Sequence, residues 1–284
     1  MNALLLMIIM ASGVLQTIAK KQYVKKVGNT GVFIFNAATT LCSAVFFLCT
    51  DSDGFQFTPA LLPYVLGFAV CFGGSVLFNL LAIREGPLSL TALATNYSLL
   101  IPTFYGLLFL REQASWQLYA GLICLAASLF LVSRKNVKFT ITVKWLIFAL
   151  LTFLCNGFGS VMQTVQQNRF DGQYKNEFNI SMLALLFILF LTISLIVERK
   201  HIAACVKVGA PFMVLKGIGN GAVNLLILVV LSRGVPASIA FPLVSGGGIV
   251  LSTLLSIFVY REKLSVQQYI GLALGVVSVV LMKI

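Results

Sequence analysis

Ten long apolar runs, separated by short polar turns, dominate the sequence. Each run is close to the roughly 20 residues that a helix needs to cross the hydrocarbon core of a bilayer. The runs lie near residues 2–21, 31–50, 60–83, 88–110, 115–133, 143–167, 178–197, 210–232, 236–260 and 265–283. A membrane β-strand would instead alternate polar and apolar residues over about 10 positions. The runs therefore predict an all-α integral membrane protein with ten transmembrane helices and no soluble domain.

The charges agree with this class. Only 10% of the 284 residues are charged, against about a quarter in soluble proteins. The net charge of +12 could indicate a nucleic-acid binder, but the basic residues stand in short clusters at the ends of the apolar runs. Such clusters are typical of a membrane surface. We therefore expect membrane lipids and a small-molecule solute as partners, and no nucleic acid; a monomer and a dimer both fit the sequence.

Residues for metal or covalent chemistry are few and scattered. The six cysteines show no CxxC spacing, and the only histidine, His201, stands in a basic loop. An intramembrane enzyme would need a nucleophile with a base, or metal ligands, inside a span. No carboxylate lies in the middle of an apolar run. We expect no catalytic residue, no metal and no cofactor. Residues 1–18, which have basic residues after them rather than before, predict a first span and not a cleaved signal.

One stretch of the sequence occurs twice. Residues 111–121 and 261–271 match at six of eleven positions, and each follows an apolar run that opens beside a glycine and a proline. More weakly, residues 12–17 in the first run resemble residues 159–164 in the sixth. Self-similarity of this kind indicates an internal duplication.

The duplication predicts two five-helix repeats, residues 1–135 and 136–284, within one membrane domain. Because five is odd, the second copy would enter the membrane from the opposite side. This is the inverted-repeat plan of secondary transporters, whose binding sites lie near the membrane midplane between the repeats. A substrate cavity between the two repeats is therefore expected.

Polar side chains inside the spans recur at helical spacing. They form one stripe in the first span, one in the sixth and one in the eighth, with isolated groups elsewhere. The candidates for lining the cavity are Gln16, Asn79, Asn96, Tyr97, Asn156, Gln163, Gln167, Lys216, Asn220 and Asn224. Hydrogen bonding between helices is the alternative role for each of them. Gly217 and Gly221, on a neighbouring face of the eighth span, would allow close helix packing.

The charged candidates leave alternatives open. Lys216 lies about five residues into its predicted span, so its stem could reach the headgroups, or its ammonium could face the cavity and attract an anionic substrate. Glu112 and Glu262 stand beside arginines at span ends, where a helix-end contact or a surface ion pair explains them. Proton coupling through a buried carboxylate therefore has no obvious residue. Pro102, Pro236 and Pro242 lie in or at the two repeated spans, which they would bend, either as gates or as fixed kinks.

The duplicated stretch resembles the drug/metabolite transporter superfamily, specifically its EamA-like members. Residues 86–89 and 234–237 enter the fourth span of each repeat, and Arg-Glu pairs at 111–112 and 261–262 leave it. The resemblance covers the whole chain. It implies a basket of helices around a central cavity that is open to one side at a time. It also implies cytoplasmic termini, as most members have.

The basic residues favour the other orientation. Most of the 20 Lys and Arg residues fall in the turns between spans 1–2, 3–4, 5–6, 7–8 and 9–10. Because positive turns stay in the cytoplasm, this predicts a multi-pass protein of the cell membrane with both termini outside. The leading hypothesis is a permease for a small polar, amino-acid-like metabolite. An exporter of amphipathic drug-like compounds is the alternative, and a non-transporting membrane assembly subunit is the alternative from another class.

Overall fold

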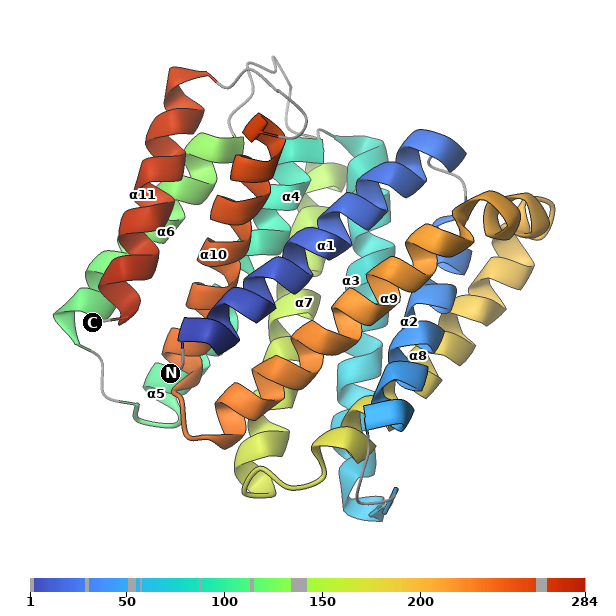
Figure 1. Ribbon diagram of the computed structural model, residues 1–284, viewed down its shortest axis with the longest axis horizontal. Helices are drawn as coiled ribbons and strands as arrows, with labels where there is room; N and C mark the ends of the chain where they lie inside the picture. Colours follow the sequence, from blue (N-terminus) through green and yellow to red (C-terminus); the bar gives the residue numbers. More distant parts are fainter. Residues whose placement is uncertain are drawn as a thin grey trace. The chain divides into compact units, whose positions relative to one another are not determined.

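The computed structural model describes residues 3–28, 31–50, 55–56, 58–86, 88–112, 115–133, 142–258 and 265–283. In these residues all regular structure is helical (Figure 1). The helices are α1 Ala3–Val27, α2 Val32–Thr50, α3 Leu62–Glu85 after a 3₁₀ turn at Pro59–Leu61, α4 Leu88–Tyr97, α5 Leu100–Leu108, α6 Trp116–Ser133, α7 Val143–Arg169, α8 Lys175–Val197, α9 Ile202–Ser232, α10 Ala237–Phe258 and α11 Val266–Lys283. The all-α class predicted from the sequence is confirmed.

Several of these helices have the length and apolarity of membrane spans. Among the described residues, five such segments are Val32–Thr50, Pro59–Glu85, Val143–Arg169, Lys175–Val197 and Ile202–Ser232. Shorter apolar helices cover Trp116–Leu131 and Val266–Ser278. The chain is therefore a helical protein that crosses the membrane several times.

The predicted fourth span is not one continuous helix. It is divided into α4 and α5 at Ser98 and Leu99. Pro102 has no N–H group to donate to the carbonyl of Ser98; that carbonyl accepts instead from the N–H of Ile101 at 3.0 Å. Pro242, in contrast, lies inside the continuous helix α10. Of Pro102 and Pro242, only Pro102 therefore stands at a break.

Helix α9 is longer than its apolar run. It begins at Ile202, ahead of the expected start near 210. Hydropathy missed this first part because it contains the exposed Lys207. Alanine, valine and lysine nevertheless continue a helix without a break.

The helices form two compact units, each of which draws on both halves of the sequence. Unit 1 comprises Met1–Ala69 and Gln166–Arg233, and unit 2 comprises Val70–Val165 and Gly234–Ile284. The unit boundaries run through α3 and α7. Compact packing thus follows a different division from the sequence repeats, which stay a prediction.

In unit 1, α1 packs against α9, and α2 packs against both α8 and α9. A Cβ added at Gly217 would lie 2.4 Å from Cβ of Cys42, and one at Gly221 would lie 2.7 Å from Cδ1 of Phe46. Glycines that let two helices approach closely are common in membrane bundles. The predicted role of Gly217 and Gly221 is therefore confirmed.

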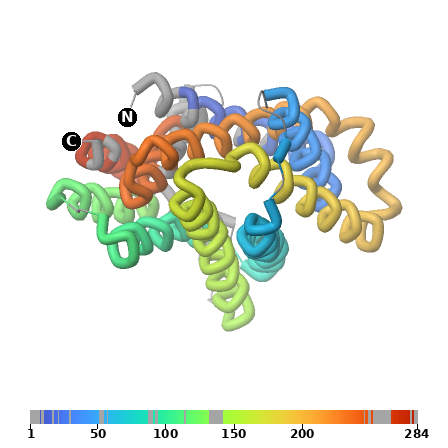
Figure 2. Tube along the Cα trace, turned by 90° about the horizontal axis from the view of Figure 1, so that it is seen from below, coloured from blue at the N-terminus to red at the C-terminus, as the bar shows by residue number. Residues whose placement is uncertain are grey.

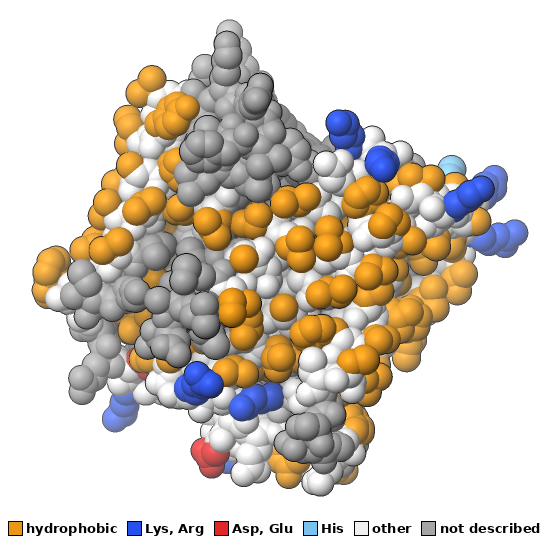
Figure 3. Space-filling model, in the orientation of Figure 1, with side chains coloured by type: hydrophobic (Ala, Val, Ile, Leu, Met, Phe, Trp, Pro, Cys, Tyr) orange, Lys and Arg blue, Asp and Glu red, His pale blue; other side chains and the backbone are white. Residues whose placement is uncertain are grey.

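One end of unit 1 is basic. In Figure 3, hydrophobic side chains cover α1 and α9, while Lys and Arg gather near the single histidine, His201, where α1 ends and α9 begins. The exposed basic residues there are Lys25, Lys26, Arg199 and Lys200. Nζ of Lys26 lies 5.1 Å from the ring centroid of Phe212 in α9. The turns after α1 and α8, which the charge count groups together, thus share one end of this unit.

In unit 2, α6 and α11 run side by side (Figures 1 and 2). The hydroxyl of Ser128 donates to the carbonyl of Gly271 at 2.6 Å, which ties the two helices together. Helix α10 packs against α5 and α11. Gly271, which ends the second copy of the duplicated stretch, therefore lies at a contact between two helices.

Candidate functional site

The interface between α2 and α9 in unit 1 is polar. Nζ of Lys216 lies 3.4 Å from Oδ1 of Asn36. One turn further along α9, Nδ2 of Asn220 donates to Oγ of Ser43 at 3.2 Å. The Ser43 hydroxyl donates in turn to the carbonyl of Gly217 at 2.7 Å. We call Asn36, Ser43, Lys216 and Asn220 the lysine cluster.

Lys216 lies deeper in its helix than the sequence indicated. With α9 beginning at Ile202, its Cα is about 21 Å along the helix at roughly 1.5 Å per residue. The adjacent Gly217 packs against Cys42, whereas the Lys216 ammonium reaches Asn36, nearer the start of α2. Helical side chains lean toward the helix N-terminus, so the stem of Lys216 runs toward the basic end of unit 1 and contacts α2 on the way.

The other candidates of unit 1 surround this cluster or lie apart from it. Gln16 of α1 packs on Gly219, where an added Cβ would lie 3.0 Å from its Cγ. Asn224 donates to the carbonyl of Asn220, one turn earlier, at 2.9 Å. Gln167 is buried at the end of α7 and donates to Oε1 of Gln166. Asn224 is thus linked to the lysine cluster through the carbonyl of Asn220, Gln16 packs on Gly219 of the same helix, and Gln167 belongs to a separate buried pair.

Unit 2 contains a second polar cluster between helices, and this one is uncharged. Nδ2 of Asn156 in α7 donates to Oγ of Ser98 at 2.6 Å and to the carbonyl of Thr95 at 3.4 Å. Nδ2 of Asn79 in α3 donates to Oγ1 of Thr95 at 2.8 Å. We call Asn79, Thr95, Ser98 and Asn156 the amide cluster. It joins α3, α4 and α7 at the break between α4 and α5.

A buried tryptophan extends this contact along α4. Nε1 of Trp145 donates to Oγ1 of Thr91 at 3.1 Å. A Cβ added at Gly86 would lie 2.3 Å from Cδ1 of the same ring. Trp145 is not among the residues predicted from the sequence, although its position at the start of an apolar run was a signal. The glycine that opens the duplicated stretch therefore leaves room for this ring.

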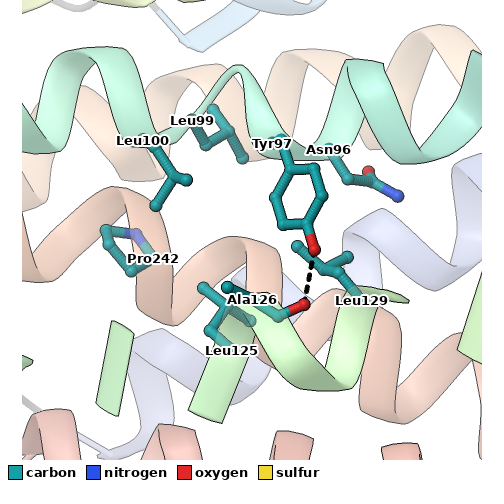
Figure 4. Close-up of a pocket in the computed structure, with 8 residues that line it drawn as sticks. All are labelled: Asn96, Tyr97, Leu99, Leu100, Leu125, Ala126, Leu129 and Pro242. Atoms are coloured by element: carbon teal, nitrogen blue, oxygen red, sulfur yellow. Dashed lines mark hydrogen bonds between the residues drawn. The ribbon is translucent and has the colours of Figure 1, made fainter. Parts of the chain in front are cut away.

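Asn96 and Tyr97, the last two residues of α4, adjoin a narrow crevice in unit 2. Figure 4 shows Tyr97 pointing across it, while Asn96 points away. The Tyr97 hydroxyl donates to the carbonyl of Ala126 in α6 at 2.5 Å. The other lining residues are apolar: Leu99, Leu100, Leu125, Ala126, Leu129 and Pro242. The crevice has no room for a water molecule, so in this conformation it is a packing gap between α4, α5, α6 and α10.

Gln163, the last candidate, is buried in α7. The ten candidates therefore do not form one site within either unit. Lys216 and Asn220 meet in the lysine cluster, Asn79 and Asn156 meet in the amide cluster, and Asn96 and Tyr97 adjoin the crevice. Among the described residues, no three His, Cys, Asp or Glu side chains lie close enough to hold a metal ion.

Two acids bind helix N-termini. The carboxylate of Glu112 accepts from the N–H groups of Ala237 and Ser238 at 2.9 Å each, at the start of α10. The carboxylate of Glu198 accepts from those of Phe33 and Ile34 at 3.0 and 2.9 Å, at the start of α2. Free N–H groups and the helix dipole both favour a carboxylate there.

The helix-end contact expected for Glu112 is thus confirmed. Glu262, its equivalent in the duplicated stretch, lies outside the described residues. Glu198 is not among the residues predicted from the sequence, although an acid directly after an apolar run was a usable signal. Neither acid is a free carboxylate inside a span.

Comparison with known proteins supports the class suggested by these helices. The sequence profile of the EamA-like transporter family matches residues 143–284, half of the chain. No curated protein matches the sequence. Among solved structures 29 chains match. One of them, described only as the crystal structure of a protein, has a TM-score of 0.75 at 15% sequence identity, over 98% of this chain and 94% of the other.

At 15% identity this likeness concerns the fold alone. The profile match concerns the family, and it covers the half of the chain that contains the second copy of the duplicated stretch. The apolar helices described above are those of a multi-pass membrane protein. The chain therefore belongs to the EamA-like transporter family of the drug/metabolite transporters.

Proposed function

We propose that this protein is a secondary transporter that moves a small polar organic metabolite, such as an amino acid, by alternating access. The observation that carries the proposal is the lysine cluster, which places two amides, a hydroxyl and an ammonium inside the apolar helices α2 and α9. Polar groups are costly in a bilayer unless they face a cavity or one another. This member of a transporter family places amides, hydroxyls and one ammonium within its spans. Such groups suit the binding of a hydrophilic solute.

The proposed architecture is ten spans in two inverted five-helix repeats, residues 1–135 and 136–284. The duplicated stretch supports it, because an odd number of spans separates the copies. Each compact unit combines helices from both sequence halves. A rearrangement within either unit would therefore move parts of both repeats.

The break between α4 and α5 suits a moving element. Interrupted helices mark the binding region of many transporters, and here the interruption adjoins both the amide cluster and the crevice. The crevice is closed in this conformation. We propose that straightening or bending at Ser98 and Leu99 opens it.

We propose uniport or exchange rather than proton antiport. Of the described acids, Glu198 is the buried one, and Glu198 and Glu112 are both occupied by backbone N–H groups. Neither is placed to carry protons with the solute. Substrate accumulation in vesicles that collapses when only the proton gradient is removed contradicts this part.

The proposed orientation has both termini outside the cytoplasm. The basic turns after α1 and α8 share one end of unit 1, and basic turns favour the cytoplasmic side. A reporter that is active only in the cytoplasm, fused after residue 284, should be inactive. An active fusion would reverse the orientation without affecting the transport proposal.

The substrate is tested by comparing the metabolites of cells and medium with and without overexpression. The transport proposal expects one or a few small polar metabolites to change in opposite directions in the two compartments. The solute found is then confirmed by flux into liposomes that contain the purified protein. A change confined to resistance against amphipathic compounds would favour a drug exporter. No flux of any solute, together with stable copurification of another membrane protein, would favour an assembly subunit.

A further inference from the structure

The lysine cluster contains a positive charge that its own residues do not neutralise. The ammonium of Lys216 has three donors. It contacts the neutral amide of Asn36 at 3.4 Å, and it lies 4.6 Å from the ring centroid of Phe35. A cation within a membrane span normally pairs with an acid or faces a polar cavity. Both contacts here are neutral, so neither supplies a counter-charge.

Among the described acids of unit 1, the buried one is already engaged. Glu198 accepts two backbone N–H bonds at the start of α2, and one oxygen also accepts from the Ser194 hydroxyl at 3.1 Å. In contrast, Lys20 on α1 is a second cation, and its charge repels that of Lys216. Helix α1 packs on α9, and Lys20 is exposed. Together the two positive charges therefore attract an anion.

We propose that the lysine cluster binds the carboxylate group of the transported solute. Lys216 provides the charge that binds it, Asn36 and Phe35 hold the ammonium in place, and Lys20 attracts the anion from the exposed side. The inference rests on the proposed transport function and narrows it to substrates that carry a carboxylate, such as amino acids and short organic acids.

The chemistry of the cluster favours a carboxylate over a phosphate. Arginine, whose paired N–H groups bind phosphate in two-point contacts, is not among the four residues. One ammonium beside a neutral amide matches a singly charged, planar group. Asn220 and Ser43 lie one turn further along α9 and offer an amide and a hydroxyl for the polar remainder of a small molecule.

The test is ligand-induced thermal stabilisation of the purified, full-length protein in neutral detergent. The probes are the common amino acids, lactate and acetate, each compared with its primary amide. At least one carboxylate should raise the melting temperature while its amide does not. Lys216→Met should weaken that binding on the order of 10- to 100-fold, the usual effect of losing a hydrogen bond to a charged group.

Asn36→Asp provides a second variant of nearly unchanged size. Its carboxylate would occupy the Lys216 ammonium from within the chain and should weaken solute binding by a similar factor. Lys207→Met is the matched control, because Lys207 is an exposed lysine on the same helix; it should bind the probe as the wild type does. The melting temperature without ligand shows whether each variant is folded.

Several results would overturn the inference. They are equal protection by a carboxylate and its amide, protection by none of the carboxylates, or unchanged binding in both Lys216→Met and Asn36→Asp. Stabilisation by added phosphatidylglycerol alone, lost in Lys216→Met, would assign the cluster to a lipid headgroup instead.

Flux into liposomes separates this inference from the proposed function. Carboxylate binding without flux keeps the site and rejects transport. Flux of a solute that is indifferent to both variants keeps transport and rejects the site.

Discussion

The lysine cluster of unit 1 and the amide cluster of unit 2 differ in how completely the chain satisfies them. In the amide cluster, Asn156 donates to Ser98 and Thr95, and Asn79 donates to Thr95, so neutral donors meet neutral acceptors. In the lysine cluster, Asn220 and Ser43 are paired in the same way, but the Lys216 ammonium has a neutral amide as its hydrogen-bond partner.

This difference separates a structural role from a binding role. A satisfied neutral cluster stabilises helix packing and needs no ligand. A cation without a counter-ion contributes little to stability, because its desolvation opposes its contacts. The amide cluster should therefore matter for folding, and the lysine cluster for the solute.

Replacing the acids that bind helix N-termini in the two units should have the largest effect on stability. Glu198→Ala removes a buried carboxylate that accepts three hydrogen bonds at the start of α2. We expect the free energy of unfolding to fall by about 3 kcal/mol, as for other charged hydrogen-bonding groups. Glu112→Ala should cost less, about 1–2 kcal/mol, because Glu112 is only partly buried. Unfolding in mixed detergent micelles measures both; a larger loss for Glu112→Ala contradicts the ranking.

Disturbing the close contact between α2 and α9 at the lysine cluster should have the next largest effect on stability. An added Cβ at Gly217 would lie 2.4 Å from Cβ of Cys42 and 3.0 Å from the carbonyl oxygen of Thr39. Gly217→Ala should therefore separate α2 from α9 and cost about 1–3 kcal/mol, as overpacking usually does.

Gly13→Ala is the matched control for this change. Gly13 also lies within a helix of unit 1, but an added Cβ there meets nothing within 4 Å. Alanine should leave stability unchanged or raise it by up to about 1 kcal/mol. Equal thermal melting of the two variants would show that α2 and α9 can move apart at no cost.

Much of the architecture could be predicted from the sequence. Continuous apolar runs indicated helices, and the spacing of Gly217 and Gly221 indicated a close helix contact. Glu112 was correctly interpreted as a helix-end group because it stands at the end of a span. Each of these features depends on neighbours in the chain, which periodicity reports directly.

The partners across helices could not be predicted in the same way. Periodicity shows that Lys216 and Asn220 share a face, but not that this face meets Asn36 and Ser43, which come much earlier in the chain. The same holds for Asn156 and Ser98. The break at Ser98 was easier to predict, since Pro102 marked it. A single span was expected because hydropathy does not register a missing N–H group.

The amide cluster should show a modest stability effect. Asn156→Leu keeps the size of the side chain but removes the donor to Ser98 and Thr95. Hydrogen bonds between membrane helices contribute about 0.6 kcal/mol on average and up to about 1.7, so we expect a loss in that range. Phe158→Leu, at an exposed position of the same helix, is the control. A loss of transport in Asn156→Leu with unchanged stability would move this cluster from structure to substrate binding.

Lys216→Met should have the smallest effect on stability. The change removes a partly buried cation and one contact with a neutral amide, and buried charges replaced by apolar groups are often tolerated or stabilising. We expect the free energy of unfolding to stay within about 0.5 kcal/mol of the wild type or to rise. Measured beside Asn156→Leu, this variant distinguishes the clusters most sharply: the neutral change lowers stability, and the charged change does not. If Lys216→Met instead destabilised the protein more than Asn156→Leu, the Lys216–Asn36 contact would be a structural one, and both clusters would serve helix packing.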